Sequence, residues 1–300
     1  MIIEVNPHSL AEISANYTKA IDWLSSVGYE INQSRIGLYK KALNSLLESG
    51  WGDLQDLKNR QHLTTVFVEV RELVSIYFGL SKRVSFNNSY SESLKHFLKG
   101  PFHATDESMN SASNRARNIG FELYINSLFS EAGFDLKLGS KSDMKFTFKG
   151  FTFYVECKRP QYYHQVNSRV KSATEQLYVR YQEGDSTSSR GIIALEVSKL
   201  FNPNNYILSV RNENDLLPLM YSEVENFIIK YNSSWNKKKD KRTIALFLAY
   251  RYLANIRDSS QLVTVRWIGS VILCKDIPGS DMKIIEELNS KFGNVIQKIC

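Results

Sequence analysis

The chain has little cysteine, proline or glycine, and it has no long apolar run. Its 300 residues include three cysteines, six prolines and 15 glycines. A chain of this length can bury a core without a disulfide framework, and low glycine and proline contents exclude collagen-like and low-complexity proteins. No segment approaches the roughly 18 apolar residues of a membrane span, and the N-terminus does not resemble a secretory signal. We therefore expect a soluble, cytoplasmic protein that does not bind membranes.

Basic residues exceed acidic residues, and the excess lies in the second part of the chain. The 38 Lys and Arg residues outnumber the 31 Asp and Glu residues, which gives a net charge of +7. Residues 1–110 carry 11 basic and 12 acidic residues, whereas residues 111–300 carry 27 and 19. Lys and Arg favour a polyanionic partner because their contacts with phosphates release counterions. An ordinary solvated basic surface explains the same charge equally well.

Residues 1–110 are predicted to form a helical N-terminal domain. Apolar residues at helical spacing, flanked by capping residues, predict helices at 9–27, 34–49 and 53–78. The composition between residues 81 and 114 turns polar and rich in turn formers, so we place a domain boundary near residue 110. A helical segment of this kind typically packs or binds a partner. We therefore expect residues 1–110 to offer a surface for a homodimer or for another protein.

Residues 111–300 are predicted to form an α/β domain. The expected order is a helix at 115–132, strands at 134–138, 143–148 and 151–158, a helix at 166–182 and a strand at 191–198. A helix at 216–231, strands at 243–250 and 262–274 and a helix from residue 281 follow as C-terminal additions. These later strands are compatible with an extension of the same sheet.

Residues 143–158 alternate between apolar and polar side chains, as a hairpin does. A two-residue turn at Lys149-Gly150 would place Asp143 directly opposite Glu156. Two opposed carboxylates repel unless a cation lies between them, and Mg²⁺ or Mn²⁺ prefers such oxygen ligands. The alternative is a register slip, which would make both acids ordinary edge charges.

The same alternation distributes the residues at the end of the hairpin between two faces. Glu156 and Lys158 share one face, whereas Cys157 projects toward the core. The two adjacent carboxylates favour a charged Lys158, so we expect its ammonium group to orient groups and stabilise charge rather than to abstract a proton. Cys157 is expected to be a small buried apolar residue rather than a nucleophile.

The helices on either side of the hairpin carry polar residues beside their apolar stripes. Glu122 borders the stripe of the helix at 115–132 and is predicted to point toward the sheet; the alternative is a half-buried acid paired with Arg115 or Lys145. Three residues share one flank of the helix at 166–182: Arg169, Gln176 and Arg180. Their alternative is an ordinary solvated helix edge.

This ordered set resembles the PD-(D/E)XK nuclease superfamily, the fold of many restriction and repair nucleases. A helix with Glu122, a strand with Asp143, the triplet Glu156-Cys157-Lys158 and a helix with Gln176 follow one another within residues 115–198. The resemblance is to uncharacterised bacterial members and implies a restriction-endonuclease-like core of helix, three strands, helix and strand. Ser142 replaces the proline of the family motif, and Arg180 stands where a branch similar to the RecB nuclease domain has tyrosine.

The resemblance implies a Mg²⁺- or Mn²⁺-dependent endonuclease that hydrolyses phosphodiester bonds of DNA rather than RNA, in restriction or antiviral defence. The implied metal ligands are Asp143, Glu156, the backbone carbonyl of Cys157 and Glu122. Lys158 and Gln176 complete the implied catalytic set. The residues expected to contact nucleic acid are Arg169, Arg180, Arg159 and Lys145. The alternative function is a non-catalytic nucleic-acid-binding or assembly protein that keeps the nuclease fold.

Overall fold

A computed structural model describes residues 2–6, 9–50, 56–82, 88–107, 111–137, 142–183, 187–236, 240–272 and 279–299. The helices are α1 (Leu10–Ser26), α2 (Arg35–Ser49), α3 (Leu57–Leu80), α4 (Asn88–Phe97), α5 (Ser111–Glu131), α6 (Val166–Glu183), α7 (Ser198–Phe201), α8 (Leu216–Asn236) and α9 (Gly279–Ile299). The strands are β1 (Ile2–Asn6), β2 (Leu136–Lys137), β3 (Met144–Phe148), β4 (Phe151–Lys158), β5 (Ser189–Glu196), β6 (Leu208–Val210), β7 (Thr243–Ile256) and β8 (Gln261–Ile272). The prediction of an α/β fold is confirmed.

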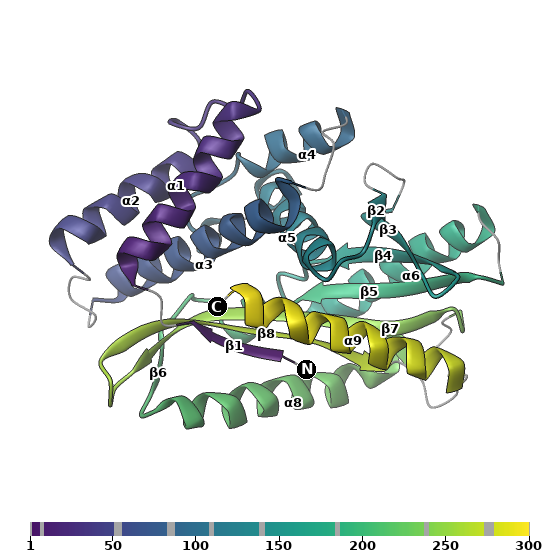
Figure 1. Ribbon diagram of the computed structural model, residues 1–300. Coiled ribbons are helices and arrows are strands. Elements are labelled where there is room, and N and C mark those ends of the chain that lie inside the picture. The colour runs from purple at the N-terminus through teal and green to yellow at the C-terminus, as the bar shows by residue number, and fades with distance from the viewer. Residues whose placement is uncertain are drawn as a thin grey trace.

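All of these strands belong to one mixed sheet (Figure 1). Its order is β1-β8-β7-β5-β4-β3-β2, and β6 pairs with β7 outside this path. The β4–β5 and β5–β7 pairs are parallel, and the segments that join them contain α6 and α8, as parallel pairs require long crossovers. The predicted C-terminal strands therefore extend the same sheet. The short strand β1, which the sequence pattern did not predict, adds to it antiparallel to β8.

Helices cover both faces of the sheet, and strand alternation supplies a core to each. Phe153 and Val155 of β4 pack in the core that includes residues of α1–α5 and α9. Tyr154, between them, packs in the opposite core with residues of α6 and α8. Figure 1 shows α1–α5 above the sheet and α8 below it. The end of β4 is therefore held between α5 on one side and α6 on the other.

The N-terminal helices share their core with the α/β part of the chain. Buried residues of α1–α4 belong to the same apolar cluster as those of α5, β3 and β4. At Gly79 the helices α3 and α5 are so close that an added Cβ atom would lie 2.6 Å from the Cβ atom of Ser127. Ser130 Oγ also donates a hydrogen bond to the Gly79 carbonyl at 2.7 Å. The expected division near residue 110 therefore does not separate two cores.

The described part of the polar segment at 81–114 includes a helix. It contains α4, whose residues Tyr90, Leu94 and Phe97 are buried on one face. The helical spacing of these three residues was masked by the polar composition around them. Predicted bounds at residues 53, 138 and 274 lie outside the described residues.

The predicted hairpin is confirmed. Phe148 pairs with Phe151 and Met144 with Val155, so the register is the expected one. Lys149 and Gly150 both have positive φ, 51° and 79°, as a two-residue type I′ turn requires. Asp143 is the residue just before the paired part of β3.

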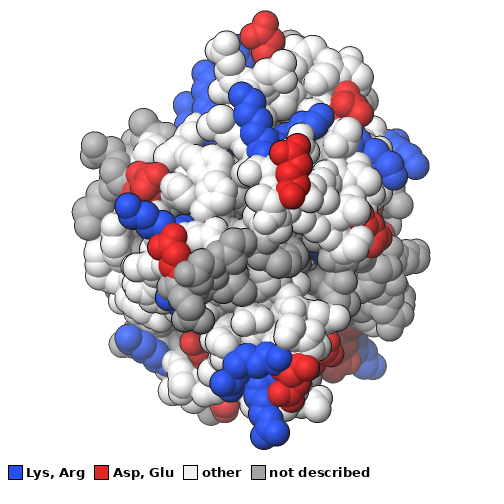
Figure 2. Space-filling model, turned by 90° about the vertical axis from the view of Figure 1, so that its left-hand side faces the viewer, with Lys and Arg blue, Asp and Glu red and all other residues white. Residues whose placement is uncertain are grey.

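Charges on one face of the molecule are mixed in sign. Figure 2 looks onto the side at the left of Figure 1, and there basic and acidic side chains alternate over a largely uncharged surface. The described basic residues on that face do not form a continuous patch. Within the described ranges, no helix combines the length and apolar character needed to cross a membrane.

Candidate functional site

Three acids predicted from the sequence, Glu122, Asp143 and Glu156, meet at the C-terminal end of β4; we call them the acid cluster. The N–H group of Cys157 donates to Asp143 Oδ2 at 2.7 Å, which holds this carboxylate beside β4. Lys158 Nζ lies 3.5 Å from Glu156 Oε2 and 3.9 Å from Asp143 Oδ2. The same ammonium group donates to the Cys157 carbonyl at 3.1 Å. A cation therefore lies beside the two acids of the hairpin, as their repulsion requires.

Glu122 joins this cluster from α5. One turn further along α5, the Asn126 side chain donates to the carbonyls of Glu122 at 2.9 Å and Asp143 at 3.3 Å. These bonds tie α5 to the start of β3. Burial and the nearby Asp143 carboxylate raise the pKa of Glu122 to about 8. The structure thus brings Glu122 to Asp143, as the sequence predicts.

Burial raises the pKa values of the carboxyl groups in the acid cluster. Burial and Asp143 raise the pKa of Glu156 to about 7, and burial raises the pKa of Asp143 despite Lys158. Glu156 Oε1 is buried and has no hydrogen-bond partner among the described residues; the Nε atom of Arg180 lies 3.8 Å from it. Strongly shifted carboxyl groups beside a cleft are typical of functional sites.

A cleft of about 240 Å³ opens beside Glu122 and Lys158. Arg169 and Gln176 of α6 line it and are exposed. Two of the three flank residues of α6 therefore line the cleft beside the acid cluster. Arg180, the third, is turned to acids rather than to solvent, since it also lies 3.6 Å from Glu183.

The structure also places the side chains of two further predicted residues, Lys145 and Cys157. The Lys145 ammonium group lies over the Tyr154 ring, 5.2 Å from its centre. Cys157 is buried in the core, as predicted, and burial raises the pKa of its thiol. A thiol in this environment is inert.

We expect the metal-free protein to lose stability as pH rises from 6.5 to 8.5. The folded-state pKa values of Glu156 and Glu122, about 7 and 8, lie above the ordinary value of 4.5. Their contribution to stability is therefore complete below about pH 4.5 and is lost as pH rises through these folded values. The melting temperature in EDTA should fall over this interval, and Glu122→Gln should flatten the fall. A flat or rising profile in the wild type would contradict the assignment. The interval avoids His62 and His103, whose lowered pKa values place their titration below it.

In the described ranges, no group of three or more His, Cys, Asp or Glu side chains is arranged to hold a metal ion as it stands. The ammonium group of Lys158 instead contacts Asp143, Glu156 and the Cys157 carbonyl. Three of the four predicted metal ligands therefore surround an ammonium group.

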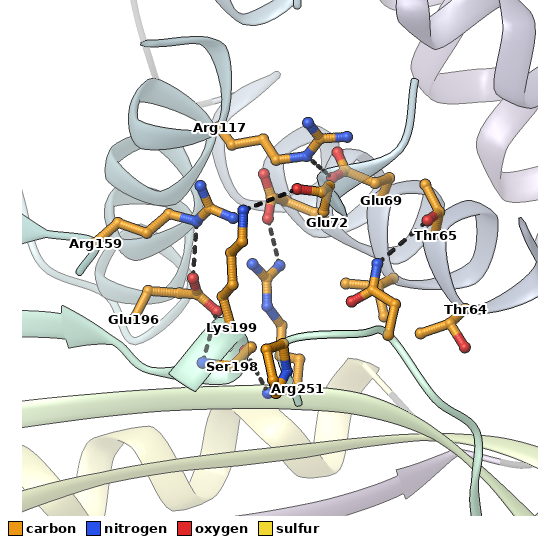
Figure 3. Close-up of a pocket in the computed structure, with 14 residues that line it drawn as sticks. Thr64, Thr65, Glu69, Glu72, Arg117, Arg159, Glu196, Ser198, Lys199 and Arg251 are labelled. Atoms are coloured by element: carbon orange, nitrogen blue, oxygen red, sulfur yellow. Dashed lines mark hydrogen bonds and ion pairs between the residues drawn. The ribbon is translucent and has the colours of Figure 1, made fainter. Parts of the chain in front are cut away.

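Arg159, which the resemblance offered as a nucleic-acid contact, lies instead in a buried ionic cluster (Figure 3). Its Nε atom donates to Glu196 at 2.8 Å, and its Nη1 atom donates to both oxygens of Glu107 at 2.8 and 2.9 Å. Arg159 also contributes to the lining of the cleft beside the acid cluster, but its guanidinium group is paired with two buried carboxylates. These pairs could not be predicted because both partners are distant in sequence from Arg159.

The buried ionic cluster joins the helical layer to the ends of the central strands. Its members are Glu69, Glu72, Glu107, Glu196, Arg35, Arg117, Arg159, Arg251 and Lys199. All of them except Arg35 and Glu107 line a small cavity of about 40 Å³. The sequence analysis did not predict this cluster. Its one sequence signal is the presence of two acids, Glu69 and Glu72, within the apolar run of α3.

Ion pairing controls the charge of the buried ionic cluster. Burial alone would raise the pKa of Glu69, but Arg117 and Arg35 lower it to about 2. Arg117 Nε lies 2.5 Å from Glu69, and Arg35 lies 3.0 Å from it. In the same way, Arg159 outweighs the effect of burial and lowers the pKa of Glu196. Glu69 and Glu196 thus stay ionised inside the protein, whereas burial raises the pKa of Glu72 despite its pairing with Arg251.

Comparison with known proteins adds no evidence on function, so the functional argument rests on the geometry of the site. No protein-family model, no curated protein and no solved structure matches the chain.

Proposed function

We propose that this protein is a divalent-metal-dependent nuclease that hydrolyses phosphodiester bonds, with DNA as its substrate. The observation that carries the proposal is the meeting of Asp143, Glu156 and Lys158 at the end of one hairpin, with Glu122 facing them from α5. This grouping is the one that the resemblance over residues 115–198 implies.

The arrangement of elements supports a restriction-endonuclease-like core. The chain order is α5, β2, β3, β4, α6 and β5. The strands β2, β3 and β4 are antiparallel, β5 is parallel to β4, and α6 lies between β4 and β5 in the chain. Helix, three strands, helix and strand is the order that the resemblance implies.

The residues at the acid cluster fit Mg²⁺ or Mn²⁺. All the candidate ligand atoms are oxygens, which hard divalent cations prefer, and the buried Glu156 Oε1 has no hydrogen-bond partner in the described part of the chain. Asp143, Glu156, the Cys157 carbonyl and Glu122 would hold the ion. A bound divalent ion screens phosphate charge and makes water more acidic.

The chain's own residues have distinct roles in this proposal. Lys158, held against Asp143 and Glu156, orients water and stabilises the charge that develops on the phosphate. Arg169 and Gln176, exposed at the cleft, contact the substrate backbone. Arg180 offsets the charge of Glu156.

A second candidate function is nucleic-acid binding without cleavage. It is favoured by the position of Lys158, whose ammonium group already contacts the candidate metal ligands. A protein that uses this arrangement only as a structural ion pair would bind nucleic acid with a steep salt dependence and would not cleave it.

We expect cleavage of DNA when Mg²⁺ or Mn²⁺ is present and none after chelation with EDTA. The measurement is an incubation of the full chain with linear duplex, circular and single-stranded DNA and with RNA, followed by gel analysis. Cleavage of the circle would show endonucleolytic attack. Binding without cleavage in either metal would reject the nuclease and leave the second candidate.

A further inference from the structure

Three aromatic side chains follow closely after the strand that ends at Lys158. Tyr162, Tyr163 and His164 lie between β4 and α6, and all three are exposed. The two tyrosines are exposed to 38% and 42%. A single exposed aromatic residue needs no explanation, but adjacent exposed rings beside a charged cleft form a surface suited to a ligand.

These rings are held in place. Tyr163 lies parallel to Tyr231, at an interplanar angle of 3° and a centroid distance of 6.4 Å, and the Tyr231 hydroxyl donates to the Tyr163 carbonyl at 3.0 Å. Tyr162 stacks on His164 with an interplanar angle of 10°. Rings that are ordered before binding lose little conformational entropy when a ligand stacks on them.

The rings lie close to the acid cluster. Tyr162 is four residues after Lys158, so their Cα atoms are at most about 14 Å apart. The intervening chain is fixed, since Gln161 is buried and its N–H group donates to Gln165 Oε1 at 2.9 Å. Cations accompany the rings: Lys230 Nζ lies 4.8 Å from the centre of the Tyr163 ring, and Arg169 lies at the cleft.

We propose that Tyr162, Tyr163 and His164 form a stacking platform for unpaired nucleobases, so that the acid cluster acts on single-stranded nucleic acid. This inference rests on the proposed function and specifies its substrate. Aromatic rings stack on bases of any sequence, and nearby cations follow the phosphates. In an intact duplex the faces of the bases are covered by their neighbours, so exposed rings have no base face to contact unless a base leaves the stack.

The test is a binding measurement on the full chain in EDTA, where a metal-dependent nuclease does not cleave. Fluorescence anisotropy would follow labelled oligodeoxyuridine, oligouridine and a duplex of equal length. At least one of the two single strands should bind more tightly than the duplex. The single strand with the higher affinity shows whether the site prefers deoxyribose or ribose. Tyr162→Leu should weaken single-strand binding by roughly 5- to 150-fold. Tyr162→Phe keeps the ring and should retain wild-type binding.

Tyr206→Leu is the matched control, because Tyr206 is exposed to 45% but lies after α7, outside the platform; it should bind as the wild type does. Tighter binding of the duplex, or an unchanged affinity of both Tyr162→Leu and Tyr163→Leu, would overturn the platform. The platform proposal and the nuclease proposal can fail independently of each other. Stacking-dependent binding without metal-dependent cleavage would reject only the nuclease, whereas cleavage unaffected by the tyrosine substitutions would reject only the platform.

Discussion

Lys158→Ala is expected to reduce Mg²⁺-dependent cleavage of DNA by at least about 100-fold, the usual cost of removing one group that stabilises transition-state charge. The Lys158 side chain is only 13% exposed and contacts both Asp143 and Glu156, so no other described side chain can take its position without rearrangement. The measurement is the initial rate of cleavage under single-turnover conditions, with circular dichroism to verify the fold.

A matched control is Lys171→Ala. Lys171 lies on the neighbouring helix α6, is 77% exposed and pairs only loosely with Glu175, at 3.8 Å. Its removal should leave the rate within about twofold of wild type, because exposed pairs contribute little. A folded Lys158→Ala protein that cleaves within tenfold of the wild-type rate would remove Lys158 from the proposed mechanism.

Glu69→Leu is expected to lower the free energy of unfolding by about 3–5 kcal/mol, because it leaves Arg35 and Arg117 buried without their shared carboxylate. Both guanidinium groups are almost fully buried, so water cannot replace the lost partner. Urea unfolding followed by circular dichroism measures the change. Since the pKa of Glu69 is lowered to about 2, its stabilisation is complete above about pH 4.5 and should disappear as pH falls through 2.

The control for this prediction is Glu175→Leu, which removes a carboxylate that is 66% exposed. A change below about 1 kcal/mol is expected there. If Glu69→Leu were as mild as this control, the buried ionic cluster would not be a stabilising element. A large loss would instead show that the helical layer and the strand ends depend on these pairs.

The buried ionic cluster also bears on the acid cluster, because Arg159 immediately follows Lys158. The bonds from Arg159 to Glu107 and Glu196 fix the backbone at the end of β4. They thereby restrict the position of the Cys157 carbonyl and of Lys158. The helical layer thus supports the site, and α5 also contributes Asn118, Phe121 and Glu122 to the lining of the cleft.

The hairpin and its acids were predictable from the sequence because the interactions that form them are local. Alternation along residues 143–158 and the Lys149-Gly150 turn determine the register within a stretch of 16 residues. Once the register is determined, Asp143 and Glu156 must be neighbours. Glu122 was predictable for a similar reason, since it borders the stripe of a helix that had to pack on the sheet.

Other features depend on contacts between distant segments, which leave no local pattern. β1 pairs with β8 across most of the chain, with Ile2 opposite Ile268. α4 is recognisable only from three buried residues in a polar stretch. The shared core of the two predicted domains likewise follows from the close packing of α3 on α5.

The sequence by itself determined the order of elements from residue 115 to residue 198 and the register of the hairpin. It also determined which types of side chain lie together at the end of the hairpin. Periodicity and turn chemistry act over a few residues, so they can be read along the chain. Only the tertiary structure decided that Arg159 is buried with acids 52 and 37 residues away. Burial and ion pairing depend on which segments meet in space, and that is decided when the helical layer packs on the sheet.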